Sequence, residues 1–443
     1  MFFLNVFIKA KRSMLNLRTN KILRDVQWSF LSIAASALAH LLLRVILGKT
    51  LGPAGLGLYT LLFTIYLFGM QFAAFGYGAA LTKYIAEYED NTSKIKEYVS
   101  SGLIGSIISG LTMGVILYLF STFISIDFFH IPEMVTPLRI TALCFPFIAI
   151  QKAVTGTLNG LRKMNYFAMI NILQNISVLL ISTFCVLTMK MGVIGAVFGF
   201  VVPTILIGTV SLLNIRKLFS LPSIIVLWDI LKEISLFGFY IVLGNSIGMI
   251  NTQIDSLLIG RFMSETDVGY YATAIIITQS MTLIPAAVQA VTNPAISIYY
   301  GKKEYSKIKQ LIRNTTLKVF AIEFILLVLL IAFGKYIIVI LFSEEFTPSY
   351  VPMLILSIGY LIYSAWTSVG TLFSSIGKAN ISFKLNGVCA LLNTILNLLL
   401  IPKLGILGAA SATTFSLILT CMINFYFTKK YISVPTFRHI SKV

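Results

Sequence analysis

Long apolar runs separated by short polar loops make up most of this chain. A helix that crosses a membrane needs about 20 consecutive apolar residues, and twelve runs of that length can be read along the sequence. The loops between them leave no room for a soluble catalytic domain. The predicted transmembrane helices are 26–47, 56–77, 99–123, 134–158, 167–189, 192–214, 234–259, 269–293, 316–342, 350–376, 381–401 and 404–428.

The composition agrees with this pattern. Of the 443 residues, 57% are apolar and only 11% are charged, and the mean hydropathy is +0.90. A soluble protein carries about 25% charged residues. We therefore predict an all-α polytopic membrane protein.

The second half of the chain echoes the first. The segment RVILGKTLGPAGLGLY (44–59) resembles the segment DSLLIGRFMSETDVGYY (255–271). A shift of 212 positions aligns identical residues of the two segments: Gly48 with Gly260, Gly57 with Gly269 and Tyr59 with Tyr271. Six helices in each half would start and end on the same side of the membrane. The echo therefore predicts two six-helix bundles related by a parallel internal repeat.

These runs divide the chain into five predicted parts. The bundles occupy 25–215 and 233–428, and 216–232 is a cytoplasmic linker between them. Residues 1–24 form a cytoplasmic, amphipathic N-terminal segment that lies in the membrane interface, and 429–443 form a cytoplasmic tail. Two mixed-charge stretches, Lys83–Glu97 and Lys302–Arg313, are predicted as surface helices at the same interface.

The distribution of Lys and Arg sets the orientation. With the N-terminus inside, 26 of the 34 Lys and Arg residues fall in cytoplasmic segments, as the positive-inside rule requires. Both termini are then cytoplasmic in a multi-pass protein of the cytoplasmic (plasma) membrane. The net charge of +18 is explained by this topology and by attraction to anionic membrane lipids, so no nucleic-acid partner is expected.

No motif indicates a catalytic, metal or cofactor site. The four cysteines lie in apolar runs without a CxxC pair, and the three histidines lack HExxH spacing. Small residues spaced by four are expected to pack helices tightly. They occur at Gly110 and Gly114, Gly156 and Gly160, Gly195 and Gly199, and Gly244 and Gly248.

Polar stripes run along one face of four predicted helices. Residues spaced by three and four share a helix face, and such a face does not point at lipid. The stripes predict a hydrated central cavity between the halves, although each alone is equally explained by hydrogen bonds between helices. The residues predicted to line the cavity are Ser36, His40, Asn159, Asn245, Thr252, Gln279, Thr282 and Gln289.

Four ionisable residues fall within or at the ends of the predicted helices, where charge is costly and indicates function. Arg44 either faces the cavity with His40 or extends to the outer headgroups. Lys152 lies deeper. Asp255 and Glu323 are candidates for ion coupling. Alternatively, Asp255 forms an ion pair with Arg261 or Arg44, and Glu323 forms one with Lys318.

Several of these segments resemble one transporter family. Arg44, Leu47 and Gly48, followed by Leu51–Pro53 and Gly57–Tyr59, are similar to the signature of polysaccharide-biosynthesis flippases, the Wzx type of the MATE-like (multidrug/oligosaccharidyl-lipid/polysaccharide) exporter superfamily. Asp255, Ile259–Gly260 and Val268–Tyr271 resemble the second signature. The resemblance implies a V-shaped pair of six-helix bundles that moves lipid-linked oligosaccharides across the membrane by alternating access.

The charges suit that substrate. A polyprenyl phosphate or pyrophosphate is anionic, and Arg can bind a phosphate through two parallel hydrogen bonds. Arg44 and Lys152 are therefore the predicted phosphate site. Tyr360, Tyr363 and Trp366 either stack on sugar rings or only pack. Expected partners are the lipid-linked oligosaccharide, membrane lipids, H+ or Na+, and a polysaccharide polymerase with glycosyltransferases.

Three other functions compete with this prediction. A cation-coupled multidrug antiporter of the same superfamily would use Asp255 and Glu323, while Arg44 and Lys152 argue against it. A peptidoglycan-precursor flippase is equally compatible with the signatures. A membrane-embedded transferase would need an acid–base or metal set, and only the weak cluster Asp127, His130 and Glu133 is present.

Overall fold

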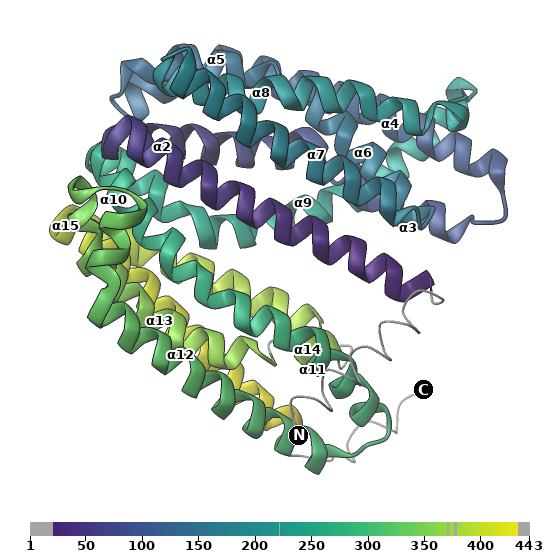
Figure 1. Cartoon of the computed structure of the whole chain (residues 1–443). Coiled ribbons are helices and arrows are strands. Elements are labelled where there is room, and N and C mark those ends of the chain that lie inside the picture. The colour runs from purple at the N-terminus through teal and green to yellow at the C-terminus, as the bar shows by residue number, and fades with distance from the viewer. Residues whose placement is uncertain (1–20, 221, 370–371, 376–378, 433–443) are drawn as a thin grey trace. The chain divides into compact units, whose positions relative to one another are not determined.

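The computed structural model describes residues 21–220, 222–369, 372–375 and 379–432 (Figure 1). Within these ranges all regular structure is helical. Most of the predicted N-terminal segment and most of the predicted tail lie outside the described residues. The main helices are α2 (Lys21–Ala74), α3 (Tyr77–Glu87), α4 (Thr92–Thr122), α5 (Val135–Ala142), α6 (Phe145–Gly160), α7 (Met164–Thr183), α8 (Gly192–Ser211), α9 (Ile224–Phe262), α10 (Glu265–Gln279), α11 (Leu283–Gly301), α12 (Tyr305–Leu341), α13 (Tyr350–Thr367), α14 (Leu372–Ser375) and α15 (Ala379–Ile432).

Eight described helical segments are long and apolar enough to span a membrane, or nine if the pair Pro132–Ala142 and Phe145–Gly160 is one span bent by 46°. Two of the eight, Gln27–Glu87 and Asn380–Lys430, have 61 and 51 residues, far more than one crossing needs. The protein is therefore an all-α polytopic membrane protein. The count of twelve spans stays a prediction.

Two glycines divide the longest helices. Gly52 in α2 has φ 68° and ψ −174°, and Gly405 in α15 has φ 60° and ψ −139°. Glycine reaches such angles because it lacks a Cβ atom. Each helix therefore consists of two arms, each with a length suited to one crossing.

The described chain forms two compact units. The first comprises Met1–Thr50 with Ile65–Leu243, and the second comprises Leu51–Thr64 with Gly244–Val443, so the divisions fall inside α2 and α9. The predicted bundle boundaries stay a prediction.

Close glycine contacts hold α3 against α6 in the first unit. A Cβ atom on Gly156 would lie 2.1 Å from the carbonyl oxygen of Gly78, and one on Gly78 would lie 2.6 Å from that of Lys152. The hydroxyl of Thr82 donates to the carbonyl of Gly156 at 3.0 Å. The predicted tight packing at Gly156 is confirmed.

The glycine pair predicted to pack on α9 does not do so. Among the described residues, a Cβ atom on Gly244 would meet only the ring of Phe383, at 3.8 Å, and one on Gly248 would meet nothing within 4 Å. That prediction is wrong, because spacing shows that two glycines share a helix face but not that another helix covers it.

The second unit contains a reciprocal contact between the second arm of α2 and α10. A Cβ atom on Gly57 would lie 1.7 Å from the carbonyl oxygen of Glu265, and one on Gly269 would lie 2.0 Å from that of Pro53. Under the shift of 212, Glu265 corresponds to Pro53 and Gly269 to Gly57. A two-fold symmetric contact has this reciprocity. The internal repeat itself stays a prediction.

The two mixed-charge stretches do not form separate surface helices, which corrects that prediction. The first contains the end of α3, a short loop and the start of α4, where Asn91 accepts a hydrogen bond from the backbone of Lys94 at 3.1 Å. The second contains a tight turn and the start of α12. Charged segments therefore extend spanning helices beyond their apolar parts.

Candidate functional site

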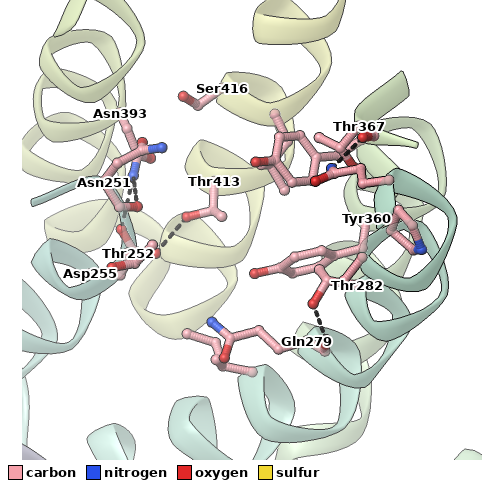
Figure 2. Close-up of a pocket in the computed structure, with 16 residues that line it drawn as sticks. Asn251, Thr252, Asp255, Gln279, Thr282, Tyr360, Thr367, Asn393, Thr413 and Ser416 are labelled. Carbon is pink, nitrogen blue, oxygen red and sulfur yellow. Dashed lines mark hydrogen bonds between the residues drawn. The ribbon is translucent and has the colours of Figure 1, made fainter. Parts of the chain in front are cut away.

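A polar cavity of about 380 Å³ lies within the second unit (Figure 2). Figure 2 shows Asp255, Asn393 and Thr413 on one side of it, with Gln279, Thr282 and Tyr360 facing them. Helices α9, α10, α11, α13 and α15 all contribute. The lining residues are Asn251, Thr252, Asp255, Ile275, Gln279, Thr282, Pro285, Ala286, Gln289, Tyr360, Tyr363, Thr367, Asn393, Thr413, Ser416 and Leu417.

Asp255 is the charged centre of this cavity. Its side chain is 2% exposed. One carboxylate oxygen accepts hydrogen bonds from the hydroxyls of Thr413 at 2.6 Å and Tyr271 at 2.7 Å. The other accepts from the side-chain amides of Asn397 at 2.7 Å and Asn393 at 3.3 Å. Such donors stabilise a buried carboxylate that has left water.

The two asparagines belong to one face of α15. Asn393 and Asn397 are four residues apart, and the amide of Asn397 also donates to the side-chain oxygen of Asn393 at 3.0 Å. The side-chain oxygen of Asn397 is buried and accepts no hydrogen bond in the described part of the chain. Carboxylate, amide and hydroxyl oxygens are ligands that hard cations prefer. The cluster can therefore hold a proton or a small cation.

The opposite side of the cavity offers aromatic rings and amides. Tyr360 and Tyr363 pack edge to face with centroids 6.4 Å apart, and Gln289 donates to the carbonyl of Thr367. The hydroxyl of Thr282 donates to the carbonyl of Gln279 at 2.7 Å. Rings with an apolar face beside polar side chains suit a ligand that carries both kinds of surface, as a sugar does.

Several predicted residues meet in this cavity. Thr252, Gln279, Thr282 and Gln289 line it together with Asp255, whereas the predicted Asn245 is not among the lining residues. The hydrogen-bond partners of Asp255 were not among the predicted site residues. Asn393 and Asn397 form a polar pair at helical spacing in the apolar run ALLNTILNLLLI, which was the available signal.

The described surroundings of the two carboxylates bear on whether either one forms an ion pair. The partners of Asp255 are uncharged, and no salt bridge to it is found among the described residues. Glu323 on α12 is fully buried, and neither of its carboxylate oxygens has a hydrogen-bond partner in the same part of the chain. Ion coupling and ion pairing therefore both stay predictions for these two carboxylates.

Glu323→Leu is expected to stabilise the protein. A buried polar group without a partner costs about 1–3 kcal/mol, and leucine has a similar volume. We expect a higher melting temperature in detergent, measured by intrinsic fluorescence. Glu323→Gln, which remains polar, serves as the control and should gain less. A melting temperature lowered by the leucine would contradict the expectation.

In the first unit, the polar stripe of α2 meets α7. The side-chain amide of Asn175 donates to the hydroxyl of Ser36 at 2.8 Å and also shares a hydrogen bond with His40. Arg44 follows one turn later on α2. This part of the stripe forms hydrogen bonds between helices, which was the second explanation considered. Asn175 was not predicted.

Lys152 stands apart from this cluster. It lies on α6 beside the close contact with α3, and its side chain is half-buried. No hydrogen bond or ion pair of its ammonium is found among the described residues. Asn159, which follows at helical spacing, is also half-buried. Within the described part of the first unit, Lys152 is thus a cation without a counter-charge, and such a group favours an anionic ligand.

Family models and relatives identify the group of proteins to which the chain is related. A family described as "Polysaccharide biosynthesis protein" matches residues 22–300, and one described as "MatE" matches 241–399. The first covers more than half of the chain. The chain belongs to the polysaccharide biosynthesis protein family.

Relatives of this family member are membrane proteins and transporters. A putative O-antigen transporter of Shigella flexneri is 21% identical over 91% of this chain and 96% of its own. An uncharacterized membrane protein of Methanocaldococcus jannaschii is 24% identical over 93% of this chain and 84% of its own. A probable low-salt glycan biosynthesis flippase of Haloferax volcanii is 26% identical over 45% of this chain and 43% of its own.

Solved structures show which fold this polysaccharide biosynthesis protein has. The lipid II flippase MurJ superposes with a TM-score of 0.76 at 18% identity, covering 91% of this chain and 87% of the other. An inward-facing multidrug resistance MATE family transporter of the MOP superfamily superposes with a TM-score of 0.74 at 17% identity, covering 91% and 98%. The chain has the fold of these transporters.

Proposed function

We propose that this protein is a flippase that moves a lipid-linked oligosaccharide across the cytoplasmic membrane by alternating access, for the synthesis of a cell-surface glycan. The observation that carries the proposal is the polar cavity that contains the buried Asp255. Membership of the polysaccharide biosynthesis protein family and its glycan-transporting relatives support it.

The (pyro)phosphate of the substrate would bind in the first unit. Lys152 supplies a positive charge that has no counter-charge among the described residues. Arg44 supplies a second cation, whose guanidinium can donate two hydrogen bonds to one phosphate. Fixed positive charge beside an anionic headgroup lowers the cost of bringing that headgroup below the membrane surface. The lipid tail would remain in the bilayer.

The cavity of the second unit, taken by itself, has groups that suit an oligosaccharide. Amide side chains of Asn251, Gln279 and Gln289 replace the hydrogen bonds that sugar hydroxyls make with water. Tyr360 and Tyr363 offer aromatic faces to the apolar faces of sugar rings.

Asp255 would couple transport to a cation. When H+ or Na+ binds at the oxygen cluster, it neutralises the buried carboxylate of Asp255. When the cation leaves, only the four hydrogen-bond donors stabilise the negative charge of that carboxylate. A cation that binds one conformation more tightly shifts the protein toward that conformation. The cation gradient would then supply the energy for transport.

A multidrug antiporter and a peptidoglycan-precursor flippase are the two alternative functions, and one observation favours each of them. The buried Asp255 would also serve a cation-coupled multidrug antiporter. The fold shared with the lipid II flippase MurJ also fits a peptidoglycan-precursor flippase. The proposed orientation, with both termini in the cytoplasm, and a role beside a polymerase and glycosyltransferases apply to either flippase.

Lys152→Gln is expected to reduce translocation of a fluorescent polyprenyl-diphosphate oligosaccharide in proteoliposomes. Loss of one charge-assisted contact of about 1.5–3 kcal/mol lowers the rate roughly tenfold or more. Lys163→Gln, which removes the same charge from the turn after α6, is the matched control.

The same assay separates the three candidates. If the wild type moves neither this lipid nor lipid II but expels a cationic dye along a cation gradient, the protein is an antiporter. Transport of lipid II alone would make it a peptidoglycan-precursor flippase. Equal transport by wild type and Lys152→Gln would remove Lys152 from the phosphate site and leave the flippase standing.

A further inference from the structure

A second polar pocket lies at the first turns of α12 in the second unit. It has a volume of about 380 Å³ and is lined by Tyr299 of α11 and by one face of α12. Lys307, Gln310, Asn314 and Lys318 recur there at intervals of three and four, so their side chains follow one another along that face. This pocket is separate from the cavity of Asp255.

The length of α12 places this pocket at the level of the lipid headgroups. The helix has 37 residues and is about 55 Å long, whereas the hydrocarbon layer is about 30 Å thick. The largely apolar part from Val319 to Leu341, which also contains Glu323 and Lys335, accounts for about 35 Å at the same rise. Lys318 therefore stands where the hydrocarbon ends, and the rest of the pocket lies among headgroups.

The charge of the pocket fits a single negative charge. Lys307 forms an ion pair with Glu304 at 3.0 Å, which leaves Lys318 as the lining cation without an ion pair in the described chain. Gln310 and Asn314 likewise make no side-chain hydrogen bond with described residues. The pocket thus offers about one net positive charge together with amide donors, the groups that bind phosphate oxygens.

The same face of α12 continues into the membrane as an apolar surface. Ile322, Ile325 and Leu329 follow Lys318 at helical spacing and are 47%, 60% and 44% exposed. A molecule with its phosphate at Lys318 would therefore have its chains beside these side chains. Burial of apolar chain surface there adds to the affinity.

We propose that this pocket binds the headgroup of a monoanionic phospholipid, such as phosphatidylglycerol, with the acyl chains along the α12 face. The predicted orientation places it in the cytoplasmic leaflet, where polybasic segments meet anionic lipid. A dianionic diphosphate fits the net charge less well. The site is thus assigned to a membrane lipid that binds beside the transport route.

The test is native mass spectrometry of the full-length protein in micelles that contain phosphatidylglycerol and phosphatidylcholine. In the pocket pair, Lys307→Gln with Lys318→Gln, we expect the phosphatidylglycerol-bound fraction to fall roughly fivefold or more, given the contribution of a lysine near a charged membrane surface. In the matched pair, Lys309→Gln with Arg313→Gln, the same charge is removed from exposed positions outside the pocket, and occupancy should stay within about twofold.

Three results would overturn the proposal. Equal loss in both pairs would mean general attraction to a basic surface, and no loss in the pocket pair would mean that the lipid binds elsewhere. Displacement of the lipid by excess inorganic phosphate would mean a site for small anions. Unchanged melting temperatures in all variants without added lipid exclude misfolding as the cause. Transport is not the readout, so failure here leaves the flippase proposal intact.

Discussion

Asp255→Asn is expected to abolish cation-coupled transport almost completely. Asparagine keeps the shape of aspartate but has no charge to attract a cation. It also replaces one of the two carboxylate oxygens, which both accept hydrogen bonds, by an NH₂ group that can only donate. At least one of the present donors therefore loses its acceptor; these donors are Tyr271, Thr413, Asn393 and Asn397. A buried donor without a partner costs about 1–3 kcal/mol, and the lost charge adds to that. We expect at least a roughly hundredfold lower rate in proteoliposomes with a cation gradient.

Two further variants test this expectation: one should reduce transport only in part, and the other should leave it unchanged. Thr413→Val keeps the carboxylate but removes the hydroxyl at 2.6 Å, so transport should persist with a weaker apparent affinity for the coupling cation. Asp90→Asn removes a carboxylate from the exposed loop before α4 and should behave as the wild type. If Asp255→Asn transports normally and keeps its cation dependence, the coupling site lies elsewhere in the protein.

The sequence was informative about the membrane class and about single helix faces. Apolar run lengths predicted the described spans, because the thickness of the hydrocarbon layer fixes how long such a run must be. The spacing of Gln279 with Thr282 and Gln289 placed these residues on one helix face, and all three line the cavity within the second unit. Periodicity succeeds there because each stripe is a property of one helix. The cavity predicted between the halves stays a prediction.

The periodicity of a single helix could not predict which side chains of different helices contact each other. No local pattern relates Asp255 on α9 to Asn397 on α15, since 142 positions separate them. Asn175, which meets Ser36 from α7, was missed for the same reason. Charge alone suggested ion pairs for Asp255 and Glu323, but the hydrogen bonds that Asp255 accepts come from uncharged donors, and no hydrogen-bond partner of Glu323 is found among the described residues. Which helix faces meet depends on packing over the whole unit.

Backbone breaks were also only partly predictable. The fourth predicted span is bent by 46° between its two helices, and the eighth is interrupted by a short 3₁₀ turn at Ser280–Thr282. Apolar character continues through both, because lipid sets the composition while local hydrogen bonding sets the bend. The start of α10 is different: Ser264 and Asp267 form a capping box that the sequence SETD encodes directly.

The reciprocal contact of Gly57 and Gly269 predicts the largest effect on stability. In Gly57→Ala the new methyl group would lie 1.7 Å from the carbonyl oxygen of Glu265, and in Gly269→Ala it would lie 2.0 Å from that of Pro53. Both neighbours are backbone atoms, so no side chain can rotate away and the second arm of α2 must separate from α10. Overpacking in a well-packed core costs typically 1–3 kcal/mol, and a backbone clash costs more. We expect each variant to lose about 3 kcal/mol or more, measured as a lower melting temperature in detergent.

Gly248→Ala is the matched control for both variants. It makes the same substitution inside a helix of the same unit, but the added methyl group meets nothing within 4 Å. Because alanine favours a helix by about 1 kcal/mol over glycine, this variant should be unchanged or slightly more stable. A similar melting temperature for Gly57→Ala and Gly248→Ala would mean that α2 and α10 do not approach closely there. If only one of Gly57→Ala and Gly269→Ala destabilises the protein, the contact lacks the reciprocity that the shift of 212 gives it, and this support for an internal repeat is lost.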